Sequence, residues 1–313
     1  MESDRQSWLG EVGVLGMNRR NADFIMRYNP RRLFPVVDEK VNTKQLAARH
    51  GIPTPELFYV VEQYGDVRHF EERIGKRQEF VVKPARGSGG SGIVLIEGRN
   101  AGGFVKQNGD VISRADFQYH LSGILSGLYS LEGLEDKAVI EALVHVDPVF
   151  ASVTWQGVPD VRLIVYKGVP VMGMLRLPTR VSDGKANLHR GAIGVGISIS
   201  EGKTMAGVHH TNLIDVHPDT GQPVRGLNVP GWESILLMAA RTYEMTGLGY
   251  IGVDWVLDID KGPLLLELNA RPGLAIQLAN HSGLFVRLEE VDKAPDTMLI
   301  SPESRVEWAR AHF

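Results

Sequence analysis

Apolar runs separated by glycine- and proline-marked turns predict a chain that mixes short strands with helices. Helical periodicity predicts a helix over 38–51, with Asp38 or Asn42 as its N-terminal cap and Gly51 just past its end. Further helices are expected over 66–78, 113–129, 232–246 and the end of 282–313, and strands over 57–61, 138–144 and in several runs after 160.

The stretch 251–273 predicts a β-hairpin, because two apolar runs flank the turn-forming residues DKG at 260–262. A turn centred on the first two of these places Asp254 opposite Glu267, with Asn269 on the same face. On the opposite, apolar face the expected neighbours are Val253, Trp255 and Leu257 on one strand and Leu264, Leu266 and Leu268 on the other.

The polar face of this hairpin indicates a metal site. Two like charges facing each other across strands are destabilising, and burying an unpaired carboxylate costs more. A divalent cation would remove both penalties, and hard oxygen ligands suit Mg²⁺. The alternative interpretation is an ordinary hairpin with two solvated acids.

A second motif is FVVKPARGSGGSGIVLI at 80–96, in which a strand carrying Lys83 precedes a loop with four glycines between 87 and 92. Repeated glycine lets backbone N–H groups converge on an anion. The loop is not a Walker A loop, since no Gly-Lys-Ser/Thr follows, and it does not open a helix as a Rossmann fingerprint does. A strand–loop–strand flap over phosphates is therefore favoured over a flexible hairpin tip.

A polar cluster, KANLHRGAIG at 185–194, interrupts the β-rich half of the chain. Arg190, and Arg176 at the end of the preceding strand, are suited to grip a phosphate or carboxylate with two hydrogen bonds. His189 is interpreted as a structural residue, because a lone histidine is more often hydrogen-bonded than catalytic. No G-x-S-x-G nucleophile elbow is present in the sequence.

Composition narrows the classes of function. The 313 residues include 34 basic and 37 acidic side chains, for a net charge of −3, which favours neither nucleic acid nor an anionic membrane as a partner. Without cysteine, thiolate chemistry and cysteine-bound metals are excluded. The polar N-terminus and the lack of a membrane-length apolar run make the cytoplasm the default expectation.

Together these motifs resemble the ATP-grasp superfamily, and within it the α-L-glutamate ligase branch that modifies a ribosomal protein. The resemblance covers roughly 36–280 and lies in DEKVNTKQLAARHGIPTP, FVVKPARGSGGSGI, DVRLIVYKG with NLHRGA, and GVDWVLDIDKGPLLLELNARPGL. It implies an α+β ATP-grasp fold in which two α/β subdomains clamp ATP. The expected divisions are an Arg-rich segment 1–37, a first helix and small subdomain 38–145, and a large subdomain 146–313.

The resemblance also implies roles for individual residues. ATP contacts are implied for Lys40, Lys83, Gly87, Ser88, Gly89, Gly90, Ser91, Gly92, Glu141, Leu143 and Val144. Mg²⁺ ligands, for two ions that Mn²⁺ can replace, are implied for Asp254, Glu267 and Asn269. Positions around the γ-phosphate and the acceptor carboxylate are implied for Arg176, Asn187 and Arg190, and a carboxylate contact beside the metals for Arg271. Contacts to the substrate are implied less specifically for Asp160 and Arg162.

The implied reaction joins a carboxylate to an amine through an acylphosphate. An amino acid such as glutamate would be joined to a peptide, a protein or a small carboxylate; a phosphotransferase that makes no amide is the alternative. Related ligases carry a full α/β domain before the first helix, where this chain has Arg19, Arg20, Arg27, Arg31 and Arg32. These arginines either form a solvated face or dock an acidic substrate. A homo-oligomer is expected only from the general frequency of symmetric assemblies.

Overall fold

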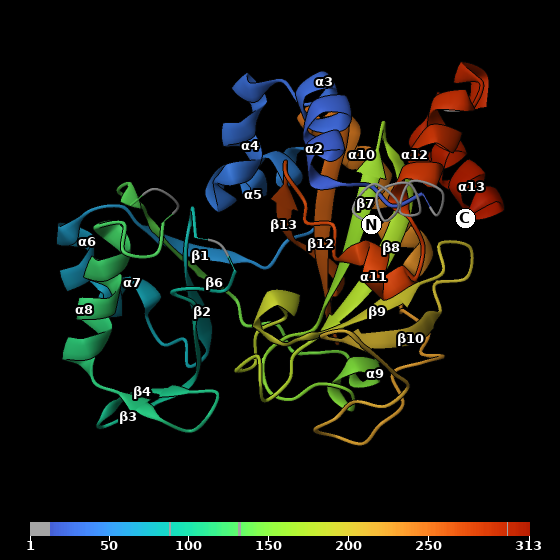
Figure 1. The fold of residues 1–313 in the computed structure, drawn as a ribbon. Helices are drawn as coiled ribbons and strands as arrows, with labels where there is room; N and C mark the ends of the chain where they lie inside the picture. The colour runs from blue at the N-terminus through green and yellow to red at the C-terminus, as the bar shows by residue number, and fades with distance from the viewer. Residues whose placement is uncertain (1–12, 88, 131–132, 299) are drawn as a thin grey trace.

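Two antiparallel sheets form the framework of the protein in a computed structural model, which describes residues 13–313 except 88, 131–132 and 299. The two sheets lie side by side, as Figure 1 shows. The six-stranded sheet has the order β1-β6-β2-β3-β4-β5, and the seven-stranded sheet has the order β11-β10-β9-β8-β7-β12-β13. Each sheet has its own hydrophobic core.

The small subdomain consists of the six-stranded sheet and the helices packed on it. Its strands are β1 (Leu57–Val61), β2 (Phe80–Pro84), β3 (Val94–Asn100), β4 (Gly103–Lys106), β5 (Val111–Ile112) and β6 (Ala138–Glu141). Its helices are α6 (Tyr64–Arg68), α7 (Phe70–Ile74) and α8 (Arg114–Leu125). Four phenylalanines pack edge to face or tilted in the core beneath α8, which fixes this helix on the sheet.

The large subdomain consists of the seven-stranded sheet and the helices around it. Its strands are β7 (Asp160–Tyr166), β8 (Val169–Leu177), β9 (Ile193–Ile197), β10 (Thr204–His209), β11 (Asn212–Ile214), β12 (Tyr250–Asp258) and β13 (Gly262–Asn269). Its helices are α9 (Pro148–Ala151), the 3-10 turn η4 (Leu188–Arg190), α10 (Trp232–Thr246), α11 (Ile276–Asn280), α12 (Leu284–Lys293), η5 (Asp296–Met298) and α13 (Pro302–His312). Helices α10 and α13 pack together against β8.

The N-terminal segment folds onto the large subdomain as short helices. They are α2 (Met17–Arg19), the π-helix η1 (Arg20–Ile25), α3 (Met26–Tyr28), η2 (Arg31–Leu33), α4 (Phe34–Asp38) and α5 (Lys40–Arg49). Buried Asn29 fixes this segment: its amide donates to the carbonyls of Tyr250 (2.6 Å) and Ala270 (3.0 Å) and accepts from Tyr250 N (2.9 Å). Ala47 and Ile52 also belong to the large core. The boundaries expected at 37/38 and 145/146 stay predictions.

Two chain segments, 53–56 and 142–145, connect the two subdomains. They lie side by side, because Ala142 N donates to the Glu56 carbonyl at 2.9 Å. On the large-subdomain side, a β13 amide donates to the Pro53 carbonyl at 2.8 Å. His145 N donates to the carboxylate of Asp258 at 3.0 Å. Both connecting segments are therefore anchored to the β12–β13 hairpin.

The expected pairing of Asp254 with Glu267 is confirmed, but the turn is different from the expected one. Asp258 pairs with Gly262 around a three-residue loop, so the pairs nearest the loop are shifted by one residue from the expected register. A bulge next to Asp254 restores it. The expected neighbour Leu266 is therefore wrong: Trp255 pairs with Leu265, and Leu266 is only half-buried.

Most elements lie where the sequence pattern placed them. Helix α10 and strand β1 have the expected bounds, and Gly51 follows α5 with a positive φ of 66°. The cap predicted for α5 is wrong, because Glu39 occupies the N-cap position and no side chain caps the helix. The helix expected over 66–78 is two short helices, α6 and α7.

Candidate functional site

Lys83, at the end of β2, belongs to a buried ionic cluster with Glu141 at the end of β6. The Glu141 carboxylate pairs with Lys83 on one oxygen and with Lys44 of α5 on the other, at 2.8 Å. Burial raises the pKa of Glu141, but the two lysines outweigh burial and hold it below its usual value. Apart from this ion pair, the Lys83 ammonium has no hydrogen-bond partner among the described residues, so donors are left for a ligand.

Lys40 lies at the start of α5, one turn before Lys44, and its ammonium donates to the Gly87 carbonyl at 2.9 Å. Burial lowers the pKa of Lys40, and the largest opposing influence is the charge of Glu267 on β13. Helix α5 therefore brings Lys40 between the glycine flap of the small subdomain and Glu267 of the large one.

Asp254, on β12, is almost fully buried and is paired with two arginines of neighbouring strands. Arg162 on β7 donates Nε to Oδ1 at 2.6 Å and also reaches Oδ2, and Arg176 on β8 donates to Oδ2 at 2.8 Å. Burial raises the pKa of Asp254, but the arginines bring it below its usual value. Guanidinium groups thus supply positive charge that the sequence argument had assigned to a metal.

Asp160 completes this network by pairing with Arg176. Burial raises the pKa of Asp160 to about 6, against the attraction of Arg176 and with a further increase from Asp254. Asp160 therefore holds the guanidinium of Arg176 between two carboxylates.

Asn269 and Glu267 lie beside Asp254 on the same face of the hairpin. The side-chain amide of Asn269 can donate to either acid. In one orientation its nitrogen lies 3.3 Å from Asp254 Oδ2, and with the amide flipped by 180° its nitrogen lies 3.1 Å from Glu267 Oε1. Glu267 is half-buried, and among the described residues it makes no ion pair. Glu267 and Asn269 offer hard oxygen donors that suit Mg²⁺, whereas both oxygens of Asp254 accept from Arg162 and Arg176, so Asp254 would have to exchange an arginine for the ion.

The glycine flap, residues 87–92, reaches from the small subdomain to the 185–190 segment of the large one. Arg190 donates to the Ser91 hydroxyl at 3.0 Å, and a Cβ at Gly89 would lie 3.3 Å from the amide nitrogen of Asn187. The base of the flap is fastened by Asp136, whose carboxylate accepts from Arg86 N at 3.0 and 3.1 Å. Ser88 lies outside the described residues.

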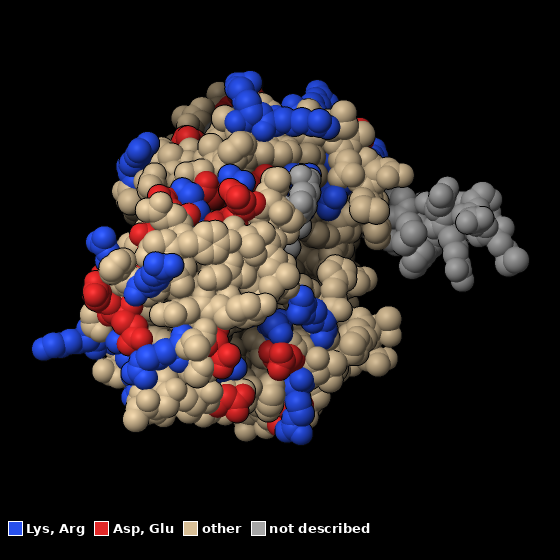
Figure 2. Space-filling model, turned by 90° about the vertical axis from the view of Figure 1, so that its left-hand side faces the viewer, with Lys and Arg blue, Asp and Glu red and all other residues tan. Residues whose placement is uncertain are grey.

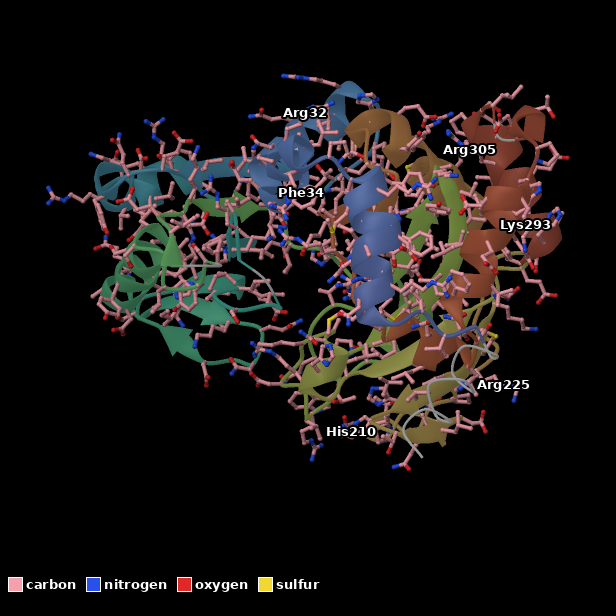
Figure 3. All side chains as sticks on the ribbon, turned by 45° about the horizontal axis from the view of Figure 1, so that its top comes forward. Arg32, Phe34, His210, Arg225, Lys293 and Arg305 are labelled. Atoms are coloured by element: carbon pink, nitrogen blue, oxygen red, sulfur yellow. The ribbon has the colours of Figure 1, made fainter. Side chains whose placement is uncertain are left out.

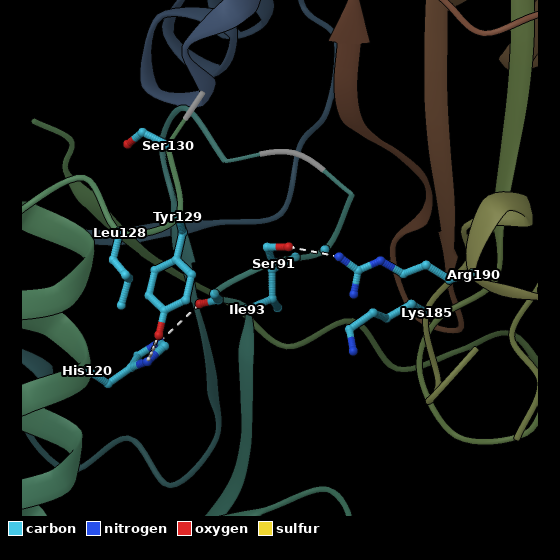
Figure 4. Close-up of a pocket in the computed structure, with 10 residues that line it drawn as sticks. Ser91, Ile93, His120, Leu128, Tyr129, Ser130, Lys185 and Arg190 are labelled. Carbon is cyan, nitrogen blue, oxygen red and sulfur yellow. Dashed lines mark hydrogen bonds between the residues drawn. The ribbon is translucent and has the colours of Figure 1, made fainter. Parts of the chain in front are cut away.

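A cavity of about 550 Å³ opens beside this flap (Figure 4). Its described lining contains two cations, Lys185 and Arg190, and no acid. Figure 4 shows both cations on the wall opposite His120 and Tyr129. The remaining lining residues are Gly90, Ser91, Gly92, Ile93, Leu128 and Ser130.

Other implied site residues lie outside these clusters. Arg271 is exposed, 3.9 Å from Asp38 Oδ2 and over the Phe34 ring, and does not point at Asp254 in any described contact. Leu143 is buried and Val144 half-buried in the connecting segment. His189 is exposed.

The N-terminal arginines do not converge on one site. Arg19 stacks on Phe285 and pairs with Asp23, and Arg20 donates to the Pro272 carbonyl at 2.8 Å. Arg31 and Arg32 are exposed; Figure 3 shows Arg32 on the N-terminal segment. On the face seen in Figure 2, basic and acidic side chains are interspersed.

The sequence argument missed Lys44, His120, Tyr129, Asp136 and Lys185. Lys44 had a signal, because it lies four residues after Lys40 and helical spacing puts both ammonium groups on one face. Lys185 lies in the polar cluster 185–194, although its own role was not recognised. His120, Tyr129 and Asp136 carried no signal, because their roles arise from contacts between segments far apart in the sequence. Among the described residues no helix is long and apolar enough to cross a membrane.

Comparison with known proteins gives one family match. The model of the family described as sugar-transfer associated ATP-grasp matches residues 19–293. A protein of Sodalis glossinidius (strain morsitans) named "Probable alpha-L-glutamate ligase" is 25% identical over 236 residues. That match covers 75% of this chain, and the chain spans only 57% of the relative.

Several solved structures are similar at lower identity. The ATP-grasp ligase PsnB with a minimal precursor is 16% identical, with a TM-score of 0.45 over 88% of this chain and 63% of that chain. D-cycloserine synthetase DcsG is 17% identical, with a TM-score of 0.46 over 85% and 73%. A RimK domain ATP-grasp protein from Sphaerobacter thermophilus is 13% identical, with a TM-score of 0.47 over 84% and 70%. These likenesses are too distant to support an argument about substrates.

Proposed function

Because this chain belongs to the sugar-transfer associated ATP-grasp family, we propose that it is an ATP-dependent carboxylate–amine ligase. ATP would phosphorylate a carboxylate, an amine would attack the acylphosphate, and an amide, ADP and phosphate would leave. The observation that carries this proposal is the convergence of Lys40, Lys83 and the glycine flap with the Asp254–Glu267 pair. The ATP-grasp family uses ATP and Mg²⁺.

The residues present fit such chemistry without a nucleophile or a strong base, because it depends on positioning and charge neutralisation. Lys83 has unused donors for a phosphate oxygen, and Lys40 places a second ammonium beside the flap. Glu267, Asn269 and Asp254 would hold two Mg²⁺ ions, for which Mn²⁺ can substitute. When bound, Mg²⁺ neutralises the phosphate charge.

We assign the acceptor carboxylate to the cavity beside the flap. Its described lining contains Lys185 and Arg190 but no acid, which favours an anion. Arg190 also contacts Ser91 of the flap, so an acceptor held there would lie next to the phosphate end of the nucleotide. The acceptor is a peptide, a protein or a small carboxylate.

The test incubates the protein with Mg-ATP and pools of amino acids and carboxylates, followed by mass spectrometry. The family description and the named relative direct the panel to amino sugars and sugar acids as well as glutamate. ADP, phosphate and a conjugate one water lighter than its parts are the expected result. A stable phosphorylated product would instead support a phosphotransferase, and an absence of both ATP binding and turnover would refute the proposal.

Glu267→Gln tests the metal assignment. Removing the open carboxylate should lower turnover by at least about 100-fold, because charge stabilisation in such sites is worth several kcal/mol. Asp260→Asn, in the exposed turn of the same hairpin, is the matched control and should keep full activity. Thermal unfolding of both variants should match the wild type. Retained activity in Glu267→Gln would mean that Glu267 holds no catalytic metal.

A further inference from the structure

The C-terminal end of the glycine flap, where it leads into β3, is bonded within the small subdomain to a histidine that the proposed chemistry does not use. His120 on α8 lies with its Nε2 3.0 Å from the Gly92 carbonyl oxygen. Its Nδ1 lies 3.3 Å from the hydroxyl of Tyr129. Figure 4 shows both contacts as dashed lines.

These contacts fix the tautomer of the neutral ring. The Gly92 carbonyl only accepts, so Nε2 carries the proton; in the neutral ring Nδ1 is then an acceptor, and the Tyr129 hydroxyl donates to it. Burial lowers the pKa of His120; the bond to Gly92 opposes this change, and the charge of Lys106 on β4 adds to it. The charged residues in the described lining of the cavity are Lys185 and Arg190, on the wall across from the ring. The neutral ring is therefore favoured near pH 7.

Packing at Gly92 is as specific as the hydrogen bond. Its φ of 75° is in the left-handed region, and an added Cβ would lie 2.6 Å from the Tyr129 ring. Helix α8 is a rigid support, because Phe117 and Leu121 on either side of His120 are fully buried. Arg190 holds the neighbouring Ser91 from the large subdomain. The C-terminal end of the flap is thus held from both subdomains.

We propose that His120 and Tyr129 form a latch that holds residues 89–92 in position over the nucleotide, which makes His120 a positioning residue. The proposal rests on the proposed function in one respect: it takes ATP as the ligand beneath the flap. The latch itself consists of contacts within the protein and exists without nucleotide.

The primary test is amide hydrogen exchange of the nucleotide-free protein over residues 89–93. His120→Ala should accelerate exchange there about tenfold, the factor that one hydrogen bond of about 1.4 kcal/mol gives. His120→Gln, whose side-chain amide can donate to Gly92, should restore most of the protection. Tyr129→Phe, which removes only the hydroxyl, should give a smaller acceleration and serves if His120→Ala does not fold.

Two exposed residues provide matched controls. His69→Ala removes an exposed histidine whose side chain pairs with Glu72 and, among the described residues, with no other acid, and Tyr119→Phe changes an exposed tyrosine next to His120 on α8. Neither should change exchange in the flap. Unchanged exchange in His120→Ala, or acceleration that spreads equally through α8, would overturn the latch.

The nucleotide then separates the two proposals. If the protein binds ATP, His120→Ala should raise KM for ATP about tenfold. Because His120 also lines the cavity assigned to the acceptor, kcat is measured at saturating acceptor, where it should stay within about threefold. A fall in kcat at unchanged KM would overturn the positioning role. If the wild type binds no ATP, the proposed function fails, while exchange in the flap still decides the latch.

Discussion

Glu141→Gln should destabilise the protein strongly, because it leaves two buried lysines without their shared counter-charge. Lys83 and Lys44 are almost fully buried, and both pair with the Glu141 carboxylate. Burial lowers the pKa of Lys44 to about 8 even with Glu141 in place. Without that carboxylate, one lysine must either stay charged and unpaired or lose its proton.

Keeping a lysine charged and unpaired, and removing its proton, both cost a similar amount of unfolding free energy. Removing one partner of a buried ion pair typically costs about 3–5 kcal/mol. Deprotonating a lysine whose usual pKa is 10.5 costs about 1.4 kcal/mol per pH unit, which is about 5 kcal/mol at pH 7 and about 1.4 kcal/mol at pH 9.5. The loss should therefore be about 3–5 kcal/mol at pH 7 and at least about 2 kcal/mol smaller at pH 9.5.

Urea-induced unfolding at the two pH values measures both numbers. Glu62→Gln is the matched control, because Glu62 also pairs with a lysine, Lys137 at 2.6 Å, but the lysine and glutamate side chains are 41% and 57% exposed. Its effect should stay below about 1 kcal/mol at either pH. A loss below 1 kcal/mol for Glu141→Gln, or a loss that does not change with pH, would refute the reasoning.

Two further predictions concern structural anchors. Asn29→Ala should cost roughly 3 kcal/mol in urea unfolding, because it leaves buried backbone groups of Tyr250 and Ala270 without partners, whereas Asn18→Ala at an exposed position should cost almost nothing. His217 is buried with Nε2 bonded to the Pro178 carbonyl, and burial lowers its pKa below 6.5 despite that bond. The stability that it contributes is therefore present above pH 6.5 and lost as pH falls through the lower folded-state pKa, so His217→Gln and wild type should converge in acid.

Equal costs for the two asparagine variants would contradict the anchoring role of Asn29. A difference between His217→Gln and wild type that stays constant from pH 7 to pH 5 would contradict the role of the neutral ring. Both comparisons use the same unfolding assay, with the m value checked for two-state behaviour.

Most of the fold was predictable because short-range patterns determine its elements. Apolar periodicity located β1 and α10, and the family resemblance supplied the ATP-grasp arrangement, which the family match confirms. The turn and bulge of the β12–β13 hairpin could not be predicted, because a three-residue loop and a bulge together give the same Asp254–Glu267 pair as a two-residue turn without one. The predicted N-terminal cap of α5 was wrong because the residues before this helix form α4 instead of a capping loop.

The candidate site was only partly predictable. The opposed acids were visible from strand alternation, but the neutralisation of Asp254 by Arg162 and Arg176 depends on the strand order, in which β7 lies beside β12 and β8 lies beside β7. The lysines of α5 follow helical spacing, whereas the contact of His120 with Gly92 joins residues 28 positions apart through tertiary packing. The roles implied for ATP and metal contacts stay predictions.

The paired connection between the subdomains has a consequence for motion. Pro53 and His145 are each anchored to the hairpin by a hydrogen bond. Rotation of the small subdomain against the large one would therefore bend the backbone at 54–56 and 142–144, which lie side by side and define a hinge axis. Rotation about such an axis displaces each strand in proportion to its distance from it. Strand β6, which carries Glu141, leads directly into one of these segments, and β2, which carries Lys83, is the next strand in the sheet, whereas β4 and β5 lie at the far edge. The ionic cluster would therefore stay almost in place against the hairpin while the outer edge of the sheet swings through the longest arc.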